Sequence, residues 1–269
     1  MRARAESKPG SNAPAATAFG QFRHVRQAFA RPGQDELVAI EDIGFDLAAG
    51  TLVSLLGPSG CGKTTFLKII GGLMRASGGT IRINGVEVEE PQPDFGMAFQ
   101  QANLMPWRDV LKNVLLPLEL RHAAGPRARE RGRELLELVG LEGFEHAYPA
   151  ELSGGMQQRV ALCRALVHEP HLLLMDEPFG ALDELTRMEM QGLLLDIRAK
   201  TNATIVFVTH SISEAVYISD QIVVFSKRPA VVADLLEVPL PYPRRAAIRY
   251  SAAFTELESR AGRALGLMR

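Results

Sequence analysis

The sequence predicts an α/β fold in which a helical subdomain is inserted into a domain built on a parallel β-sheet. The first observation is a set of short apolar runs with the length of strands buried in a parallel sheet, at residues 52–56, 172–175, 205–208 and 222–225. The second is that glycine-rich or polar residues follow the first three runs directly. The third is that helical periodicity replaces the strand pattern between about residues 100 and 166, where prolines divide the chain into short pieces.

The composition narrows the classes of protein that the chain can belong to. With 269 residues it can bury one large core, or a core with a subdomain. A net charge of −1 provides no strongly basic face, so we expect no nucleic-acid partner. The two cysteines, Cys61 and Cys163, are too few for a disulfide framework and fit a reducing compartment. We expect neither a membrane span nor a secretory signal, because no apolar run has the length that a span needs.

Composition and spacing also predict how the chain divides. Residues 1–20 are rich in Ala, Ser, Pro and Gly and are expected to be a disordered tail, with a transit peptide as the alternative. The main domain is expected over residues 21–235 and the helical subdomain at about 100–166. Residues 236–269 are expected to be a short, partly helical C-terminal extension, with apolar residues at helical spacing. These are Phe254, Leu257, Ala261, Leu265 and Met268. A helix that covers its own domain is the main interpretation, and a subunit contact is the alternative.

The first apolar run leads into the pattern G-x-x-x-x-G-K-[ST], which binds the phosphates of nucleoside triphosphates. The loop and the threonine after it are Gly57, Pro58, Ser59, Gly60, Cys61, Gly62, Lys63, Thr64 and Thr65. Glycines let backbone N–H groups turn toward the phosphates, and a helix that opens near Gly62 adds its positive end. Lys63 is expected to contact the β- and γ-phosphates and Thr64 to bind Mg²⁺.

Cys61 lies at the start of this helix, where the pKa of a thiol tends to fall. Alkylation that ATP blocks is therefore one expectation for Cys61. A small residue that the loop merely tolerates is the alternative.

Acidic and imidazole side chains follow the second and third apolar runs. Asp176 and Glu177 come directly after residue 175, and Thr209 and His210 follow residue 208. Parallel strands bring their carboxyl ends to one edge of a sheet, where α/β proteins bind ligands. Asp176 is expected in the Mg²⁺ shell, and Glu177 is expected to polarise an attacking water. Two solvated loop carboxylates are the alternative.

Another motif precedes a long helical stretch. Ser153 reads as an N-cap, and Gly154 and Gly155 then expose two backbone amides. Such a helix end can bind an anion, although the pattern alone identifies neither the phosphate nor the molecule that carries it.

The order of these motifs resembles that of the ATP-binding subunits of ABC transporters, over roughly residues 22–229. Residues 152–159, LSGGMQQR, match the signature sequence of that family and include Gln157. The resemblance implies that Gln100 senses the γ-phosphate and contributes to the metal site, and that His210 is the switch histidine. It places Asp183 in the D-loop and matches Phe29 to the aromatic residue that stacks on adenine. A core position for Phe29 is the alternative.

Within the family, the sequence at residues 103–107, 177–183 and 243–245 resembles that of the importers of nitrate, sulfonate and taurine type. The resemblance implies an ATPase with ATP and Mg²⁺ that powers uptake of a small anionic solute through an integral membrane permease. A periplasmic solute-binding protein would supply the solute, and the subunit would sit at the cytoplasmic face of the bacterial inner membrane. Residues 101–120 would form a groove for a helix of the permease, or simply core.

The resemblance further implies two subunits that close head to tail over two ATP molecules. Each site would combine the phosphate loop of one chain with the signature helix of the other. A single copy of each motif agrees with a homodimer, or with a pair formed with a related subunit. The alternatives are a soluble ABC ATPase of translation or DNA repair, and a non-catalytic regulatory module.

Overall fold

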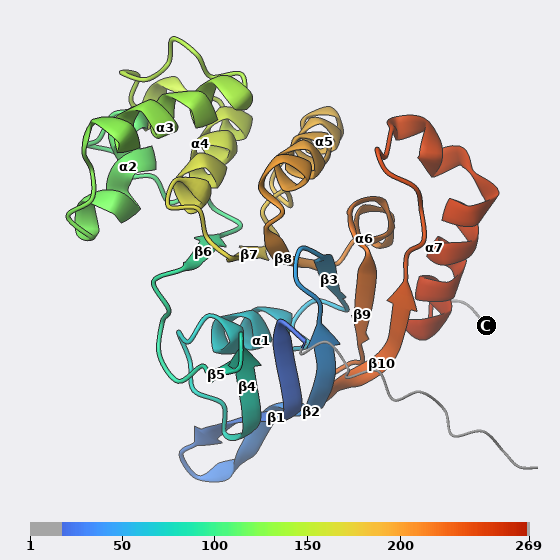
Figure 1. Ribbon diagram of the computed structural model, residues 1–269. Coiled ribbons are helices and arrows are strands. Elements are labelled where there is room, and N and C mark those ends of the chain that lie inside the picture. Colours follow the sequence, from blue (N-terminus) through green and yellow to red (C-terminus); the bar gives the residue numbers. More distant parts are fainter. Residues whose placement is uncertain (1–17, 268–269) are drawn as a thin grey trace, which may run out of the picture.

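A computed structural model of the protein describes residues 18–267 (Figure 1). The expected tail at residues 1–20 therefore falls almost entirely outside the described residues, and so does Met268. The strands that are described form one mixed sheet in the order β5-β4-β1-β2-β10-β9-β3-β8-β7-β6. The domain boundaries expected from the sequence stay predictions.

The parallel half of the sheet confirms the four predicted strands. They are β3 (Leu52–Leu56), β7 (Leu172–Asp176), β8 (Thr204–Thr209) and β9 (Gln221–Phe225). A further parallel strand, β6 (Phe95–Ala98), pairs with β7. Parallel pairing of β9 with β3, of β3 with β8 and of β8 with β7 brings their carboxyl ends to one edge.

The other half of the sheet is mainly antiparallel and was not predicted. It comprises β1 (Gly20–Arg31), β2 (Gln34–Leu47), β4 (Gly78–Ile83) and β5 (Val86–Glu87), and β10 (Ala230–Glu237) joins it to β9. Buried and exposed residues are interspersed along β1 and β2, because one face of this region meets solvent. Strand β1 therefore has no long continuous apolar run, and the single run in β2, at residues 37–40, is only partly buried.

Two hydrophobic clusters cover the two faces of the parallel strands. Along β8, Ile205 and Phe207 belong to one cluster, and Val206 and Val208 belong to the other. This alternation follows from the two-residue period of a strand. The second cluster also holds side chains of helix α1 (Lys63–Ile70) and of β1 and β2, so these elements cover that face.

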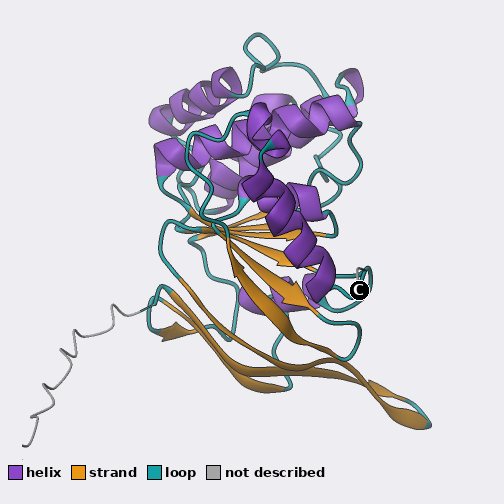
Figure 2. Ribbon diagram, turned by 90° about the vertical axis from the view of Figure 1, so that its right-hand side faces the viewer, coloured by secondary structure: helices purple, strands orange, loops and turns teal. Residues whose placement is uncertain are grey.

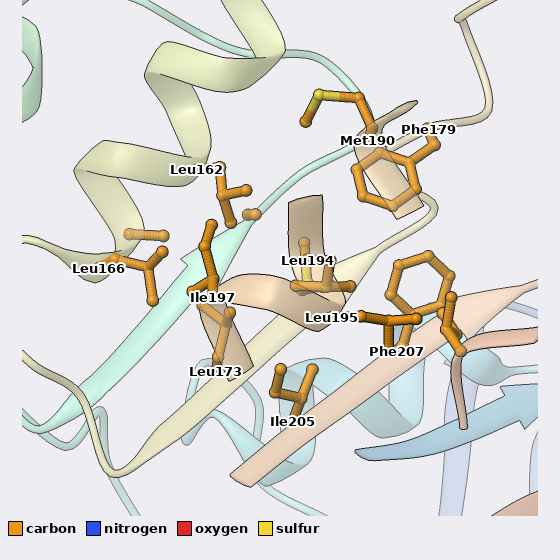
Figure 3. Close-up of a cluster of buried hydrophobic side chains, with 14 of the residues drawn as sticks. Leu162, Leu166, Leu173, Phe179, Met190, Leu194, Leu195, Ile197, Ile205 and Phe207 are labelled. Carbon is orange, nitrogen blue, oxygen red and sulfur yellow. The ribbon is translucent and has the colours of Figure 1, made fainter. Parts of the chain in front are cut away.

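The first cluster joins the other face to helices α4 (Gly154–Leu166), α5 (Glu184–Thr201) and α6 (Ile212–Ile218). Figure 3 shows the part of it around α4, α5, β7 and β8. Its labelled side chains are Leu162, Leu166, Leu173, Phe179, Met190, Leu194, Leu195, Ile197, Ile205 and Phe207. In Figure 2 most of the helices lie above the twisted strands.

Between β6 and β7 the chain is helical, with α2 (Val110–Leu120), α3 (Pro126–Leu138), the short 3₁₀ helix η1 (Pro149–Glu151) and α4. These helices form a group at one end of the sheet (Figure 1). The N-cap Asp109 accepts a hydrogen bond from the N–H of Lys112, which explains where α2 begins. No helix among residues 18–267 is long and apolar enough to cross a membrane.

The chain ends in the 3₁₀ helix η2 (Ala246–Tyr250) and helix α7 (Ala252–Ala264). Phe254 and Ala261 are fully buried and belong to the cluster that contains α5 and α6. Of the predicted helical pattern, Phe254, Leu257 and Ala261 lie in α7, and the burial of Phe254 and Ala261 packs this helix against its own chain.

Candidate nucleotide-binding site

The phosphate loop joins the end of β3 to the start of α1. Lys63 is only 4% exposed, and its Nζ donates hydrogen bonds to the carbonyl oxygens of Gly57 at 2.7 Å and Pro58 at 3.0 Å. Gly62, at φ 121°, occupies a backbone conformation that side-chain-bearing residues rarely adopt. The first N–H groups of α1 have no partner within the helix, so the loop wraps around a positive helix end.

The carboxyl end of β7 lies beside this loop. The hydroxyl of Thr64 donates a 2.8 Å hydrogen bond to Oδ1 of Asp176. Burial raises the pKa of Asp176, and the neighbouring charge of Glu177 raises it further. A hydroxyl and one carboxylate suit Mg²⁺, which prefers oxygen ligands and completes its shell with phosphates and water. No group of three or more Asp, Glu, His or Cys side chains gathers as a metal site within the described chain.

The residue that follows β7, Glu177, turns toward β8. Glu177 has φ 45°, an uncommon value for a residue with a side chain, and its N–H donates to the carbonyl of Val208 at 3.1 Å. Oε2 of Glu177 lies 2.9 Å from Nδ1 of His210, at the end of β8. The two predicted side chains are therefore in direct contact.

A pocket connects these groups to the hairpin of β1 and β2. Ser59, Gly60, Gly62, Lys63, Thr64 and Thr65 line it, together with Glu177, Phe29, Leu37, Ala39 and Arg228. Phe29 is half-buried and belongs to neither hydrophobic cluster. Its position at the mouth of the phosphate loop favours the adenine-contact interpretation over the core interpretation.

Arg228 is a pocket residue that the sequence did not reveal. Its Nη2 and Nε donate to the carbonyl oxygen of Gly60 at 2.7 and 3.2 Å. These two hydrogen bonds hold the phosphate loop in place. A single arginine after β9 belongs to no motif, and only the fold brings it back to the loop.

The signature residues 152–159 lie at the start of α4, apart from the phosphate loop. Ser153 caps α4 as predicted, with its Oγ accepting the N–H of Met156 at 3.3 Å. Gln157 donates to the carbonyls of Pro149 and Leu152, and so holds the loop before the helix. None of the residues 152–157 lines the pocket. The pocket of one chain thus contains the phosphate loop without the signature helix.

Asp183 lies next to that helix, at the start of α5. It accepts hydrogen bonds from the N–H of Thr186 at 3.0 Å and from its hydroxyl at 2.8 Å, which lowers the pKa of Asp183. A Cβ built on Gly155 would lie 2.7 Å from the methyl carbon of Thr186, so α4 and α5 approach closely here. Asp183 and the signature therefore share one exposed surface, outside the pocket.

Gln100 follows β6 and is exposed. The backbone carbonyl of Gln100 accepts a 2.6 Å hydrogen bond from Nε2 of Gln158. The side chain of Gln100 lies near Gly180, because a Cβ built on Gly180 would be 3.6 Å from Nε2 of Gln100. Gln100 thus lies between α4 and the loop after Glu177, although it does not line the pocket.

The expectation of a lowered thiol pKa at Cys61 is wrong. Cys61 is 2% exposed, and burial raises the pKa of its thiol, outweighing the lowering effect of Lys63. The side chain packs in the cluster between α1 and the sheet, which agrees with the alternative of a small residue that fits the loop.

The parallel strands of the sheet carry a phosphate loop, two acids and a histidine at one edge, and the signature helix lies apart from them. This combination is that of an ATP-binding cassette ATPase. The family model described as ABC transporter matches residues 40–180. The chain is also 48% identical over 206 residues to an uncharacterized ABC transporter ATP-binding protein of Methanocaldococcus jannaschii, covering 77% of each chain. The chain therefore belongs to the ABC transporter family and is an ATPase.

Other relatives have more specific names. The aliphatic sulfonates import ATP-binding protein SsuB of Bacillus subtilis is 44% identical over 218 residues, which cover 81% of this chain and 84% of SsuB. Among solved structures, the dimeric ABC transporter cassette MJ0796 superimposes with a TM-score of 0.73 at 32% identity, over 82% of this chain and all of that one. A post-hydrolysis dimer of the same cassette, bound to ADP and Pi, gives 0.72 at 31% identity.

Proposed function

We propose that this chain is the ATP-hydrolysing subunit of an importer for a small anionic solute of sulfonate, nitrate or taurine type. The similarity to SsuB, an aliphatic sulfonates import ATP-binding protein, supports the importer and, within this solute class, favours a sulfonate. The observation that carries the catalytic part is the contact of Glu177 with His210 beside the phosphate loop.

The chain's own residues account for the chemistry of hydrolysis. Lys63 exchanges its two carbonyl partners for phosphate oxygens, and the N–H groups at the start of α1 bind the same phosphates. Glu177 accepts the proton of the attacking water, while His210 orients its carboxylate. Gln100 responds to the γ-phosphate from the end of β6. Phe29 stacks on adenine.

Thr64 and Asp176 would hold Mg²⁺, because their oxygens already face each other at 2.8 Å. When bound, Mg²⁺ neutralises charge on the phosphates.

The composite site supplies the reason for two subunits. Ser153, Gly154 and Gly155 lie outside the pocket, so the signature helix would reach the γ-phosphate of ATP held by a second chain. Asp183 would lie at the contact between the chains. The dimeric cassette structures support the pairing of two chains. Closure on ATP and opening after hydrolysis would form the transport cycle.

A groove between the sheet edge and α2 suits the permease. Its apolar lining includes Phe95, Met97, Phe99, Met105, Leu116 and Leu120. Its charged lining consists of Arg121 and Arg164, whereas burial lowers the pKa of the nearby His168 and so disfavours its charged form. Leu120 is 75% exposed. An amphipathic helix with an acidic residue would complement this groove. The subunit would then sit at the cytoplasmic face of the inner membrane, with a periplasmic binding protein delivering the solute to the permease.

The test is affinity capture of the Glu177→Gln protein with ATP from detergent-solubilised native membranes and cytosol, read by mass spectrometry. A multi-span permease should be captured by this protein and lost when Leu120→Asp is added. Leu267→Asp is the matched control, since Leu267 is 70% exposed and lies outside the groove. Capture of ribosomal or DNA-repair proteins without a permease would contradict the importer and favour a soluble ABC ATPase.

A further inference from the structure

A carboxylate is buried behind His210 without an ion-pair partner. Glu214, in the first turn of α6, is 7% exposed, and no lysine, arginine or histidine of the described chain forms an ion pair with it. Its Oε2 accepts a hydrogen bond from the hydroxyl of Thr209 at 2.5 Å, and its Oε1 accepts one from Nε2 of Gln191 at 3.0 Å. A buried carboxylate costs free energy unless its hydrogen bonds are satisfied, and here both oxygens have donors.

Further hydrogen bonds link Glu214 to the residues on either side of His210. The hydroxyl of Thr209 donates to Glu214 and also accepts the N–H of Ser211 at 3.0 Å. The hydroxyl of Ser211 in turn accepts the N–H of Glu214 at 3.3 Å. Of the two neighbours of His210, Thr209 is therefore hydrogen-bonded to the carboxylate of Glu214, and Ser211 is hydrogen-bonded to the Thr209 hydroxyl and to the backbone N–H of Glu214. These hydrogen bonds limit the directions in which the imidazole can point.

The C-terminal segment completes the arrangement. Arg249, in η2, donates through Nη2 to Oε1 of Gln191 and through Nη1 to Oγ of Ser213 at 3.0 Å. Its guanidinium lies 3.9 Å from the centre of the Tyr217 ring. Arginine can only donate hydrogen bonds, so the oxygen of the Gln191 amide must face Arg249 and its NH₂ must face Glu214. Arg249 therefore fixes the orientation of the Gln191 amide, so that Gln191 donates to Glu214.

We propose that Glu214 is a positioning residue for His210, and that Arg249 and Gln191 of the C-terminal half keep it in place. The inference rests on the proposed role of His210 in hydrolysis. It assigns a task in the ATPase reaction to a segment that follows every nucleotide-binding motif. If the Thr209–Ser211 turn is released, the Glu177–His210 contact loses its fixed geometry, although no ATP contact is removed.

The first experiment compares Thr209→Val with Thr209→Ser, because Val keeps the volume and loses the hydroxyl, whereas Ser keeps the hydroxyl. Thr209→Val is expected to lower kcat roughly tenfold to a hundredfold, with unchanged affinity for ATP, since small displacements of catalytic groups have effects of this size. Thr209→Ser should retain the kcat of the wild type. Equal kcat values for the wild type and the Val variant would overturn the proposal.

The second experiment separates positioning from general stabilisation. Glu214→Gln is measured alone and together with His210→Ala. If Glu214 acts through His210, its substitution lowers kcat in the wild-type background and has no further effect in the His210→Ala background. The same fold-loss in both backgrounds would overturn the proposal. Wild-type turnover by His210→Ala alone would instead refute the proposed role of His210, and the two failures are thus distinguishable.

The third experiment tests the contribution of the C-terminal segment. Arg249→Leu keeps much of the apolar stem and removes the donors, and it should reproduce the loss of kcat seen with Thr209→Val. Arg260→Leu is the matched control, since Arg260 lies on α7 and its one ion pair within residues 18–267 is with Asp234, at 3.6 Å on the surface. Wild-type turnover by Arg249→Leu, or an equal loss in the control, would overturn this part of the proposal.

Discussion

Nδ1 of His210 lies 2.9 Å from Oε2 of Glu177, so one hydrogen bond joins the ends of two neighbouring strands at the pocket. Glu177 reaches this contact because its backbone leaves the strand conformation at φ 45°. The carboxylate is therefore directed by the fold before any nucleotide binds. Such preorganisation is what a general base needs in order to act on a bound water.

Glu177→Gln should abolish turnover while sparing ATP binding. The amide keeps the shape of the side chain and cannot accept the proton of the attacking water. Loss of a positioned base lowers rates by roughly 10²–10⁴. Steady-state phosphate release and equilibrium binding of ATP measure the two effects separately. Near-wild-type turnover would remove Glu177 from its proposed role.

Lys63→Ala should weaken the binding of ATP. The substitution removes the ammonium that faces the phosphates and leaves the carbonyls of Gly57 and Pro58 without their donor. A hydrogen bond to a charged group contributes about 1.5–3 kcal/mol, which corresponds to roughly tenfold to a hundredfold in affinity. Calorimetric titration with ATP measures it, and Lys200→Ala at the exposed end of α5 is the control. Unchanged affinity in the Lys63 variant would contradict the site.

Phe29→Ala should weaken ATP binding, and Phe29→Tyr should preserve it. Stacking of a base on an aromatic ring contributes about 1–3 kcal/mol, so the alanine variant should lose roughly tenfold in affinity. Fluorescent-nucleotide displacement measures this loss, and thermal unfolding serves as the control. A lower Tm with unchanged ATP affinity would show that Phe29 is a core residue.

The central strands and the motifs at their ends could be predicted from the sequence for a physical reason. Strands such as β3 and β8 are buried on both faces, so they appear as continuous apolar runs. Buried and exposed residues are mixed along β1 and β2, so most of their length shows no such run. Arg228 and Glu214 could not be predicted, because their partners lie at Gly60 and Gln191, and only the folded chain brings these pairs together.

Cys61 should resist alkylation in the folded protein. Burial raises the pKa of its thiol, so at neutral pH the thiolate fraction lies below that of an exposed cysteine, whose pKa is about 8.5. The rate of modification should therefore be slow at pH 7, rise with pH beyond that usual value, and increase sharply when the protein is unfolded in urea. Peptide mass spectrometry after iodoacetamide treatment measures it. Rapid modification at pH 7 that ATP prevents would contradict this prediction.

A site shared between two chains can be tested directly at Gly154. A Cβ built on Gly154 meets no atom within 4 Å, so Gly154→Asp should fold normally. The new carboxylate lies at the start of α4, where it stabilises its own helix and would repel phosphates held by a second chain. Gly192→Asp, at an equally open position in α5, is the matched control.

The measurement is the molar mass by light scattering of the Glu177→Gln protein with ATP and Mg²⁺. We predict a dimer for Glu177→Gln and for its Gly192→Asp derivative, and a monomer that still binds ATP for the Gly154→Asp derivative. A dimer that forms equally well with Gly154→Asp, or an ATP-bound Glu177→Gln protein that stays monomeric, would contradict the composite site.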